Sequence, residues 1–202
     1  MLDCSELCGK IVAEQVIDCN SIIVKGIEQA VLLINRCDID NYSVVKSDTE
    51  HKATAINLKP GTTGYLIKGL NGKSLFNASH SINVNDDAPD DWNHTVALRG
   101  WNLTEANLVY IRNLGRGADL VAITLDKTAS DDLNKYKVYG LENGLKIGEY
   151  SQNTGENKGA FIYTLASKAP DFETDPPVVW LEADLPATDA KYLNKLAVAV
   201  TP

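Results

Sequence analysis

The stretch from His94 to Leu125 limits the possible folds most, because it predicts a strand, a helix and a second strand in succession. Residues 94–99 alternate between polar and apolar side chains, as in a half-buried strand. Residues 120–125 are apolar enough for a strand that is covered on both faces. Between them, apolar side chains recur at helical spacing, at Ala106, Val109, Tyr110 and Leu114. One amphipathic helix among many strands predicts a mainly β (α+β) fold, a β-sandwich or barrel with one flanking helix at about residues 103–115.

Capping signals give the expected ends of this helix. Asn102 is the expected N-cap, and Glu105 stands three residues later, as a capping box requires. Trp101 precedes the cap, where a large apolar residue fixes the direction of the incoming chain. Gly115 and Gly117 are expected to stop the helix, because glycine readily adopts the left-handed conformation that ends helices.

Two Asn-Gly pairs predict tight hairpins, since this dipeptide favours the type I′ turn. Asn71-Gly72 would join strands at 64–69 and 74–84. Asn143-Gly144 would join strands at 135–142 and 145–150, with Tyr139 opposite Gly148.

The rest of the chain also favours strands. Residues 21–35 predict two strands with a break near Lys25-Gly26 or Glu28-Gln29, because β-branched residues are dense there. Further expectations are an alternating strand at 52–58, a turn at 59–61, a strand at 160–166, a short edge strand at 178–181 and a short helix at 189–196. We expect one domain over residues 1–202, with an N-terminal segment at 1–20 that fits helix or strand, a projecting loop at 36–51 and a C-terminal extension at 182–202.

Charge and composition exclude several classes of function. The formal net charge of −8 argues against binding nucleic acid by neutralising its phosphates. No apolar run is long enough to span a membrane, and residues 1–4 lack the features of a signal peptide, so we expect folding in a reducing cytosol. The cysteines are therefore expected to be thiols, and their spacing does not match structural zinc sites; they are Cys4, Cys8, Cys19 and Cys37.

No motif in the chain predicts catalysis. Gly72-Lys73-Ser74 ends like a phosphate-binding loop, but Ile67 stands where that motif requires glycine. A catalytic histidine needs a nucleophile or an orienting carboxylate, and the sequence shows no nucleophile turn beside its histidines, which are His51, His80 and His94. We therefore expect no catalytic residue, no cofactor and no metal ion.

One alternative is a carbohydrate- or Ca²⁺-binding β-sandwich module. Asn83 to Asp91 could gather oxygen ligands for Ca²⁺, although this loop lacks the glycine and the bidentate glutamate of a calcium loop. Trp92, Trp101 and Trp180 could line a sugar-binding face, although two of them flank the predicted helix and are more simply packing residues.

The C-terminal half resembles a known family. Its features are the strand with His94-Thr95-Val96, a helix ending in Asn-Leu-Gly-Arg-Gly at 113–117, and the strand with Val121-Ala122-Ile123. They continue with Tyr-Gly-Leu-Glu-Asn-Gly-Leu at 139–145 and Glu-x-x-Pro-Pro at 173–177. This order is similar to the tail tube proteins, or closely related virion structural proteins, of bacteriophages that infect Bacteroidetes, over roughly residues 74–181.

The resemblance implies a virion structural protein that assembles in the host cytoplasm. Its copies would form hexameric rings that stack into a tube. The tube would contact other virion tail proteins and conduct phage DNA without binding it specifically. An acidic lumen would keep the DNA from adhering. A β-rich subunit suits this role, because ring closure covers the free edges of its sheets.

Overall fold

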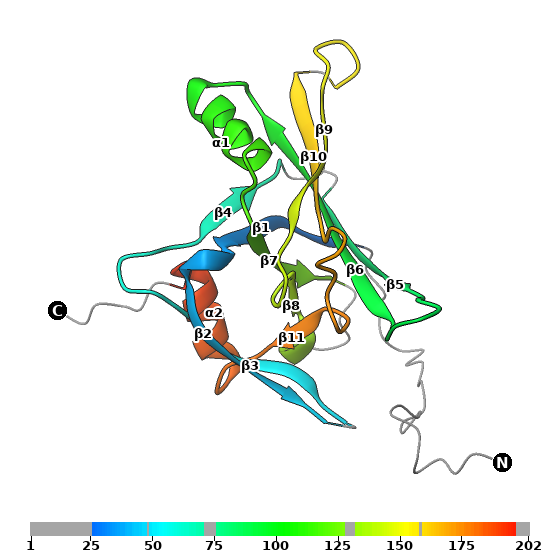
Figure 1. Cartoon of the computed structure of the whole chain (residues 1–202). Helices are drawn as coiled ribbons and strands as arrows, with labels where there is room; N and C mark the ends of the chain where they lie inside the picture. Colours follow the sequence, from blue (N-terminus) through cyan, green and yellow to red (C-terminus); the bar gives the residue numbers. More distant parts are fainter. Residues whose placement is uncertain (1–25, 48, 71–75, 128–131, 158, 197–202) are drawn as a thin grey trace, which may run out of the picture.

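The computed structural model describes residues 26–47, 49–70, 76–127, 132–157 and 159–196 (Figure 1). This part of the chain forms two β-sheets and two α-helices. The strands are β1 Ile27–Asn35, β2 Ile39–Lys46, β3 His51–Leu58, β4 Tyr65–Lys68, β5 Asn77–Asn83, β6 Asp91–Trp101, β7 Leu120–Asp126, β8 Tyr136–Tyr139, β9 Lys146–Gln152, β10 Ala160–Ala166 and β11 Val178–Trp180. The helices are α1 Glu105–Gly115 and α2 Leu185–Leu193, and short 3-10 turns lie at Arg36–Asp38 and Asp132–Asn134.

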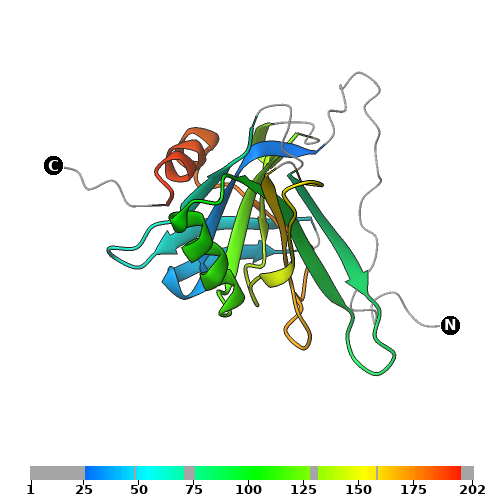
Figure 2. The same ribbon diagram turned by 90° about the horizontal axis from the view of Figure 1, so that it is seen from above.

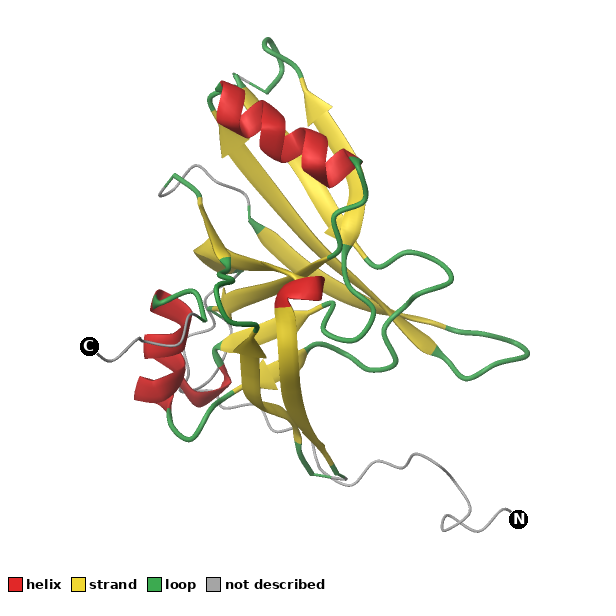
Figure 3. Cartoon of the chain, turned by 60° about the vertical axis from the view of Figure 1, so that its left-hand side comes forward, coloured by secondary structure: helices red, strands yellow, loops and turns green. Residues whose placement is uncertain are grey.

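The two sheets form a β-sandwich with a flanking helix, which confirms the predicted fold class. One sheet has seven strands in the order β2-β3-β11-β8-β7-β1-β4, and the other has four in the order β5-β6-β10-β9. The seven-stranded sheet curves around α2, while α1 lies beside β4 and the four-stranded sheet (Figures 1 and 3). The β5–β6 hairpin lies on the opposite side of the molecule from the two helices (Figure 2).

Two hydrophobic cores share the middle of the seven-stranded sheet. The first lies between the sheets and includes Leu33 of β1, Val96 of β6 and Phe161 of β10. The second lies on the other face, where α2 contributes Tyr192. Alternate side chains of β1 and β7 enter each core, so Leu120–Ile123 are all buried. This two-sided burial explains why Leu120–Ile123 of β7 are all apolar and confirms the prediction of a strand covered on both faces.

The predicted strand–helix–strand unit is present, but its N-cap was assigned to the wrong residue. Thr104 is the N-cap, and its hydroxyl accepts a hydrogen bond from the Asn107 N–H at 3.3 Å. Asn102 has a φ of 60° rather than the extended conformation of an N-cap. Its carbonyl instead accepts a bond from the Asn107 side chain at 2.6 Å. At the other end, Gly117 has the expected positive φ of 95°.

Neither predicted Asn-Gly hairpin forms. β4 pairs with β1 and β5 pairs with β6, while β8 pairs with β7 and β11 and β9 pairs with β10. In each case the chain crosses from the seven-stranded sheet to the four-stranded sheet instead of turning back on itself. Gly148 therefore lies beside Thr164 of β10 and does not face Tyr139. Burial of both faces of β8 outweighs the local turn preference. Residues 71–75 lie outside the described part of the chain.

Several smaller expectations also change. β11 was predicted to be an edge strand, but it lies between β3 and β8 because Trp180 is buried in the second core. α2 begins at Leu185, four residues before the predicted helix, with Asp184 as N-cap. Much of the loop predicted at 36–51 is a strand, because residues 39–46 form β2, which pairs with β3, and the Ser47 N–H donates to the Glu50 carbonyl at 2.9 Å. β1 is one strand with a register shift between Ile27 and Val31. Gly26 precedes it with a φ of 87°; the strand expected at 21–24, like the segment 1–20, lies outside the described residues.

Gly100 allows the close packing of the first core. A Cβ atom at this position would overlap the ring of Phe161, which lies opposite it in the β6–β10 pair. The glycine is therefore required by the space that the Phe161 ring occupies.

We expect Gly100→Ala to lower the free energy of unfolding by about 1–3 kcal/mol, because the ring must move out of a packed core. Urea denaturation measures this loss. Gly155→Ala is the matched control, because Gly155 is exposed and its Cβ would meet only the Asn153 side chain at 3.5 Å. Equal stability of the two variants would contradict the packing described for Phe161.

Candidate functional site

The most concentrated polar structure in the described part of the chain surrounds the crossing from β8 to β9. Residues 140–145 turn the chain out of one sheet and into the other. Gly140 and Gly144 have φ values of 73° and 82°, which L side chains rarely adopt. Leu145 then exchanges two backbone hydrogen bonds with Leu120, at 2.7 and 2.9 Å. We call residues 140–145 the sheet-crossing turn.

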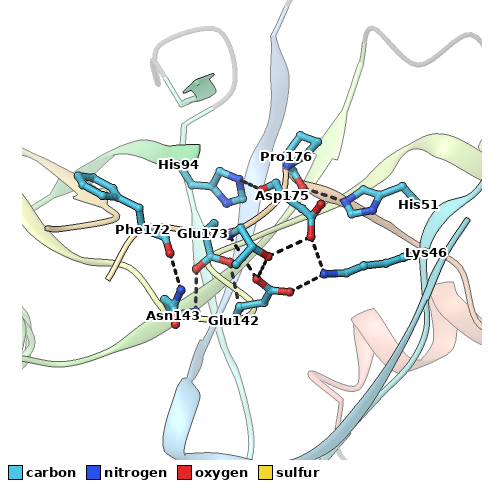
Figure 4. Close-up of polar contacts among 10 residues, drawn as sticks. Lys46, His51, His94, Glu142, Asn143, Phe172, Glu173, Asp175 and Pro176 are labelled. Atoms are coloured by element: carbon cyan, nitrogen blue, oxygen red, sulfur yellow. Dashed lines mark hydrogen bonds and ion pairs between the residues drawn. The ribbon is translucent and has the colours of Figure 1, made fainter. Parts of the chain in front are cut away.

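The carboxylate of Glu173 is buried beneath this turn and holds it (Figure 4). One oxygen accepts the N–H groups of Asn143 at 2.8 Å and Gly144 at 3.2 Å, and the other accepts that of Glu142 at 3.0 Å. Burial raises the pKa of Glu173, and the three N–H groups oppose that rise. Converging N–H groups of this kind bind anions. Here the protein's own carboxylate fills the place that an external anion would take.

His94 joins the turn to the segment that follows Glu173. Its Nδ1 accepts the Gly140 N–H at 3.2 Å, so Nε2 carries the proton and donates to the Asp175 carbonyl at 3.1 Å. Burial lowers the pKa of His94 to about 4. The ring is therefore neutral at pH 7, and both nitrogens are used in structural hydrogen bonds. This arrangement gives His94 a structural role.

Lys46 attaches the β2–β3 hairpin to the same place. Its ammonium group lies 2.7 Å from a Glu142 oxygen and 2.5 Å from an Asp175 oxygen. Partial burial lowers the pKa of Lys46, but the bonds to these carboxylates outweigh it and raise the pKa to about 12. The Thr174 hydroxyl donates to Glu142, and the His51 ring lies 3.0 Å from the Pro176 carbonyl.

These six residues, which we call the corner cluster, connect chain segments rather than expose reactive groups. They are Lys46, His51, His94, Glu142, Glu173 and Asp175. The Ser167 hydroxyl accepts the backbone N–H of His94, whereas the two ring nitrogens of His94 bond to the Gly140 N–H and the Asp175 carbonyl. Among the described residues, no group of three or more His, Cys, Asp or Glu side chains is arranged to hold a metal ion.

The other candidates from the sequence do not converge. Trp92 and Trp101 lie on opposite faces of β6, and Trp180 is buried in the second core, so the three do not form one sugar-binding face. In the acidic loop, Asn85 donates to the Pro89 carbonyl and to an Asp91 oxygen, so the loop bonds to itself. Cys37 is an exposed thiol, and Cys4, Cys8 and Cys19 precede the described residues.

The amino-acid sequence did not predict the role of Glu173. This residue is one of three acidic residues in the extended, proline-containing run at 170–177, where a side chain that stays buried needs hydrogen-bond donors from elsewhere. Those donors are backbone groups, and a sequence does not display them.

Comparisons with protein families, with curated proteins and with solved structures gave no match. None of the helices described for this chain is long and apolar enough to cross a membrane.

We expect Glu173→Gln to lower the free energy of unfolding by about 2 kcal/mol or more, because the amide NH₂ would face a backbone N–H and leave it unpaired. Chemical denaturation measures the loss. Glu156→Gln is the control, since Glu156 is exposed in the β9–β10 loop. A Glu173→Gln variant as stable as the control would show that the carboxylate does not hold the turn.

Stability should also fall in acid through His94. Its pKa is about 4 in the folded state and 6.5 in the unfolded chain, so the unfolded state binds the proton first as the pH drops. This group then removes about 2–3 kcal/mol of stability between pH 6.5 and pH 4. The raised pKa of Glu173 acts in the opposite direction, because its contribution is lost as pH rises.

Comparing the wild type with His94→Gln isolates the histidine. We expect the variant to be less stable at pH 7 but to lose less stability between pH 7 and pH 4. His80→Gln is the comparison variant: burial also lowers the pKa of His80, but this ring is exposed, so its removal should flatten the profile less than His94→Gln does. Parallel pH profiles for the wild type and His94→Gln would exclude a neutral, buried His94.

Proposed function

We propose that this chain is a self-assembling virion structural protein of the tail-tube type. In this proposal its copies join edge to edge into rings, the rings stack, and the resulting tube conducts phage DNA. The observation that carries the proposal is the nature of β5. This strand is an edge of the four-stranded sheet, is largely exposed, and contains no Asp, Glu, Lys or Arg over Asn77–Asn83.

An exposed edge without charge is unusual for a protein that remains a monomer. The backbone groups of an edge strand are free to pair with another chain, and monomers discourage this with lysine, proline or bulges. All four edge strands of the two sheets carry exposed apolar side chains. These are Tyr42 and Val45 on β2, Tyr65 on β4, Ile82 on β5 and Tyr150 on β9. Pairing between copies would cover both the backbone groups and these side chains.

The outer face of the four-stranded sheet suits contact with a passing polyanion. Side chains alternate between the two faces of each paired strand, so one set points away from the first core. Most side chains of this set are uncharged, and many of them are small and polar. Its cations are few. Arg99 donates to the Asn157 carbonyl and lies 4.7 Å from the Trp101 ring, and Lys146 pairs with Asp171. Because phosphate affinity depends on available cations, DNA would find little to bind on this face.

The resemblance of residues 74–181 to phage tail tube proteins supports the same proposal. It adds the expectation of hexameric rings and of contacts with other tail proteins. The corner cluster also fits a structural subunit better than an enzyme, because its polar groups hold the chain in place. For a sugar- or Ca²⁺-binding module, the scattered tryptophans and the self-bonded acidic loop offer no comparable support.

Light scattering and negative-stain electron microscopy of the purified protein test the proposal. We expect rings or tubes whose abundance rises with protein concentration. A strict monomer at every concentration would refute it.

Charge placed on β5 should block assembly without unfolding the subunit. We expect Ser79→Lys combined with Ser81→Lys to weaken self-association by about tenfold or more, because like charges and lysine solvation oppose edge pairing. Thr154→Lys, in the exposed β9–β10 loop, should assemble as the wild type does. Thermal unfolding curves check that the double variant is folded. Unchanged assembly by a folded double variant would show that β5 is not a joining edge.

A further inference from the structure

A groove runs between α1 and the free edge of β4. It consists of two adjoining hollows of about 560 and 320 Å³, which share Tyr65 and Tyr110. All four residues of β4 line the larger hollow, while Ala106 and Val109 of α1 line the smaller one. We call this feature the α1–β4 groove; the two elements that border it lie side by side in Figures 1 and 3.

The first core reaches the surface in this groove. Phe161 and Tyr163, which are 3% and 1% exposed, form part of the lining, and the hydroxyls of Tyr110 and Tyr163 lie 2.9 Å apart. The rim is apolar as well, because Tyr65 and Leu70 are 53% and 50% exposed. β4 ends the seven-stranded sheet, so its outer edge pairs with no other described strand. An added strand could bond to this edge and extend the core at the same time.

The charge of the groove differs from that of the whole protein. Lys68 and Lys195 line the larger hollow, and neither hollow has an aspartate or glutamate among its lining residues. Both lysines are exposed, and neither forms an ion pair with a described carboxylate. In a chain of net charge −8, the groove therefore favours an acidic, apolar segment.

Residues 1–25 have this chemistry. They contain four carboxylates and two lysines, and their β-branched residues gather at 11–12, 16–17 and 22–24. The sequence of residues 10–17 and 21–24 is compatible with strands. Twenty-five residues can reach about 80 Å when extended, which is enough to span a neighbouring subunit.

We propose that the α1–β4 groove takes a stretch of residues 1–25 from a neighbouring copy as an added strand on β4. The inference rests on the proposed self-assembly and identifies one acceptor surface and its occupant. A neighbour is the donor because residues 1–25 lead into β1, which pairs with the opposite edge of β4. The donor's own segment would have to pass around the end of β4, whereas a neighbour's segment reaches the free edge directly.

Disulfide cross-linking in the full chain tests the proposal. Leu70→Cys places a thiol on the rim of the groove, and residues 1–25 supply Cys4, Cys8 and Cys19. Copies labelled with ¹⁵N are mixed with unlabelled copies, oxidised mildly and digested for mass spectrometry. We expect cross-links of mixed isotope between the introduced thiol and one of these cysteines. Val84→Cys is the control, because Val84 is 71% exposed and lies in the β5–β6 loop, away from the groove.

Charge reversal provides an independent readout. Adding Lys68→Glu and Lys195→Glu to the Leu70→Cys chain should lower the cross-link yield by about threefold to tenfold, because two exposed attractions become repulsions. Lys168→Glu, at an exposed lysine outside the groove, should leave the yield unchanged.

The outcomes separate this proposal from the proposed function. Rings or tubes without cross-links to residues 1–25, cross-links only within one copy, or equal yields from Leu70→Cys and Val84→Cys would overturn the groove assignment and leave self-assembly standing. A protein that remains monomeric in the same preparations would overturn both.

Discussion

The bond between the Glu173 carboxylate and three N–H groups of the sheet-crossing turn is the constraint on which the sandwich depends. A chain that leaves one sheet and enters another must expose several backbone donors at the crossing, and buried donors without partners are costly. Glu173 satisfies three of them with one side chain. Its own backbone pairs with Trp92 of β6 at 2.7 and 3.0 Å, so the same residue also fixes the four-stranded sheet.

The surrounding polar residues extend this connection to elements far apart in the sequence. His94 reaches the sheet-crossing turn from β6. Lys46 reaches it from β2, which is the edge of the seven-stranded sheet opposite to β4. A buried cluster of this kind adds little stability by itself, because desolvation of charges offsets much of their attraction. Its value lies in specifying one arrangement of segments, since any other pairing would leave a buried ion or imidazole without partners.

The sequence predicted those parts of the fold that depend on local patterns. The apolar run of β7, the alternation of β10 and the helical spacing of α1 each identify an element from its own residues. The Asn-Gly pairs failed for the converse reason, because turn preference is local whereas the choice of partner strand depends on burial of both faces of β8. Glu173 and its N–H donors come from segments about 30 residues apart, and no pattern within either segment reveals that they meet.

The shared position of β1 and β7 has a consequence for how the subunit can respond to its surroundings. These neighbouring strands contribute to both cores, whereas β2, β4, β5 and β9 lie at the margins. Local opening begins where few buried contacts must be broken, so the amide protons of β1 and β7 should be the last to exchange with solvent, and those of the marginal strands the first. The four marginal strands can therefore change their shape while β1 and β7 keep their register.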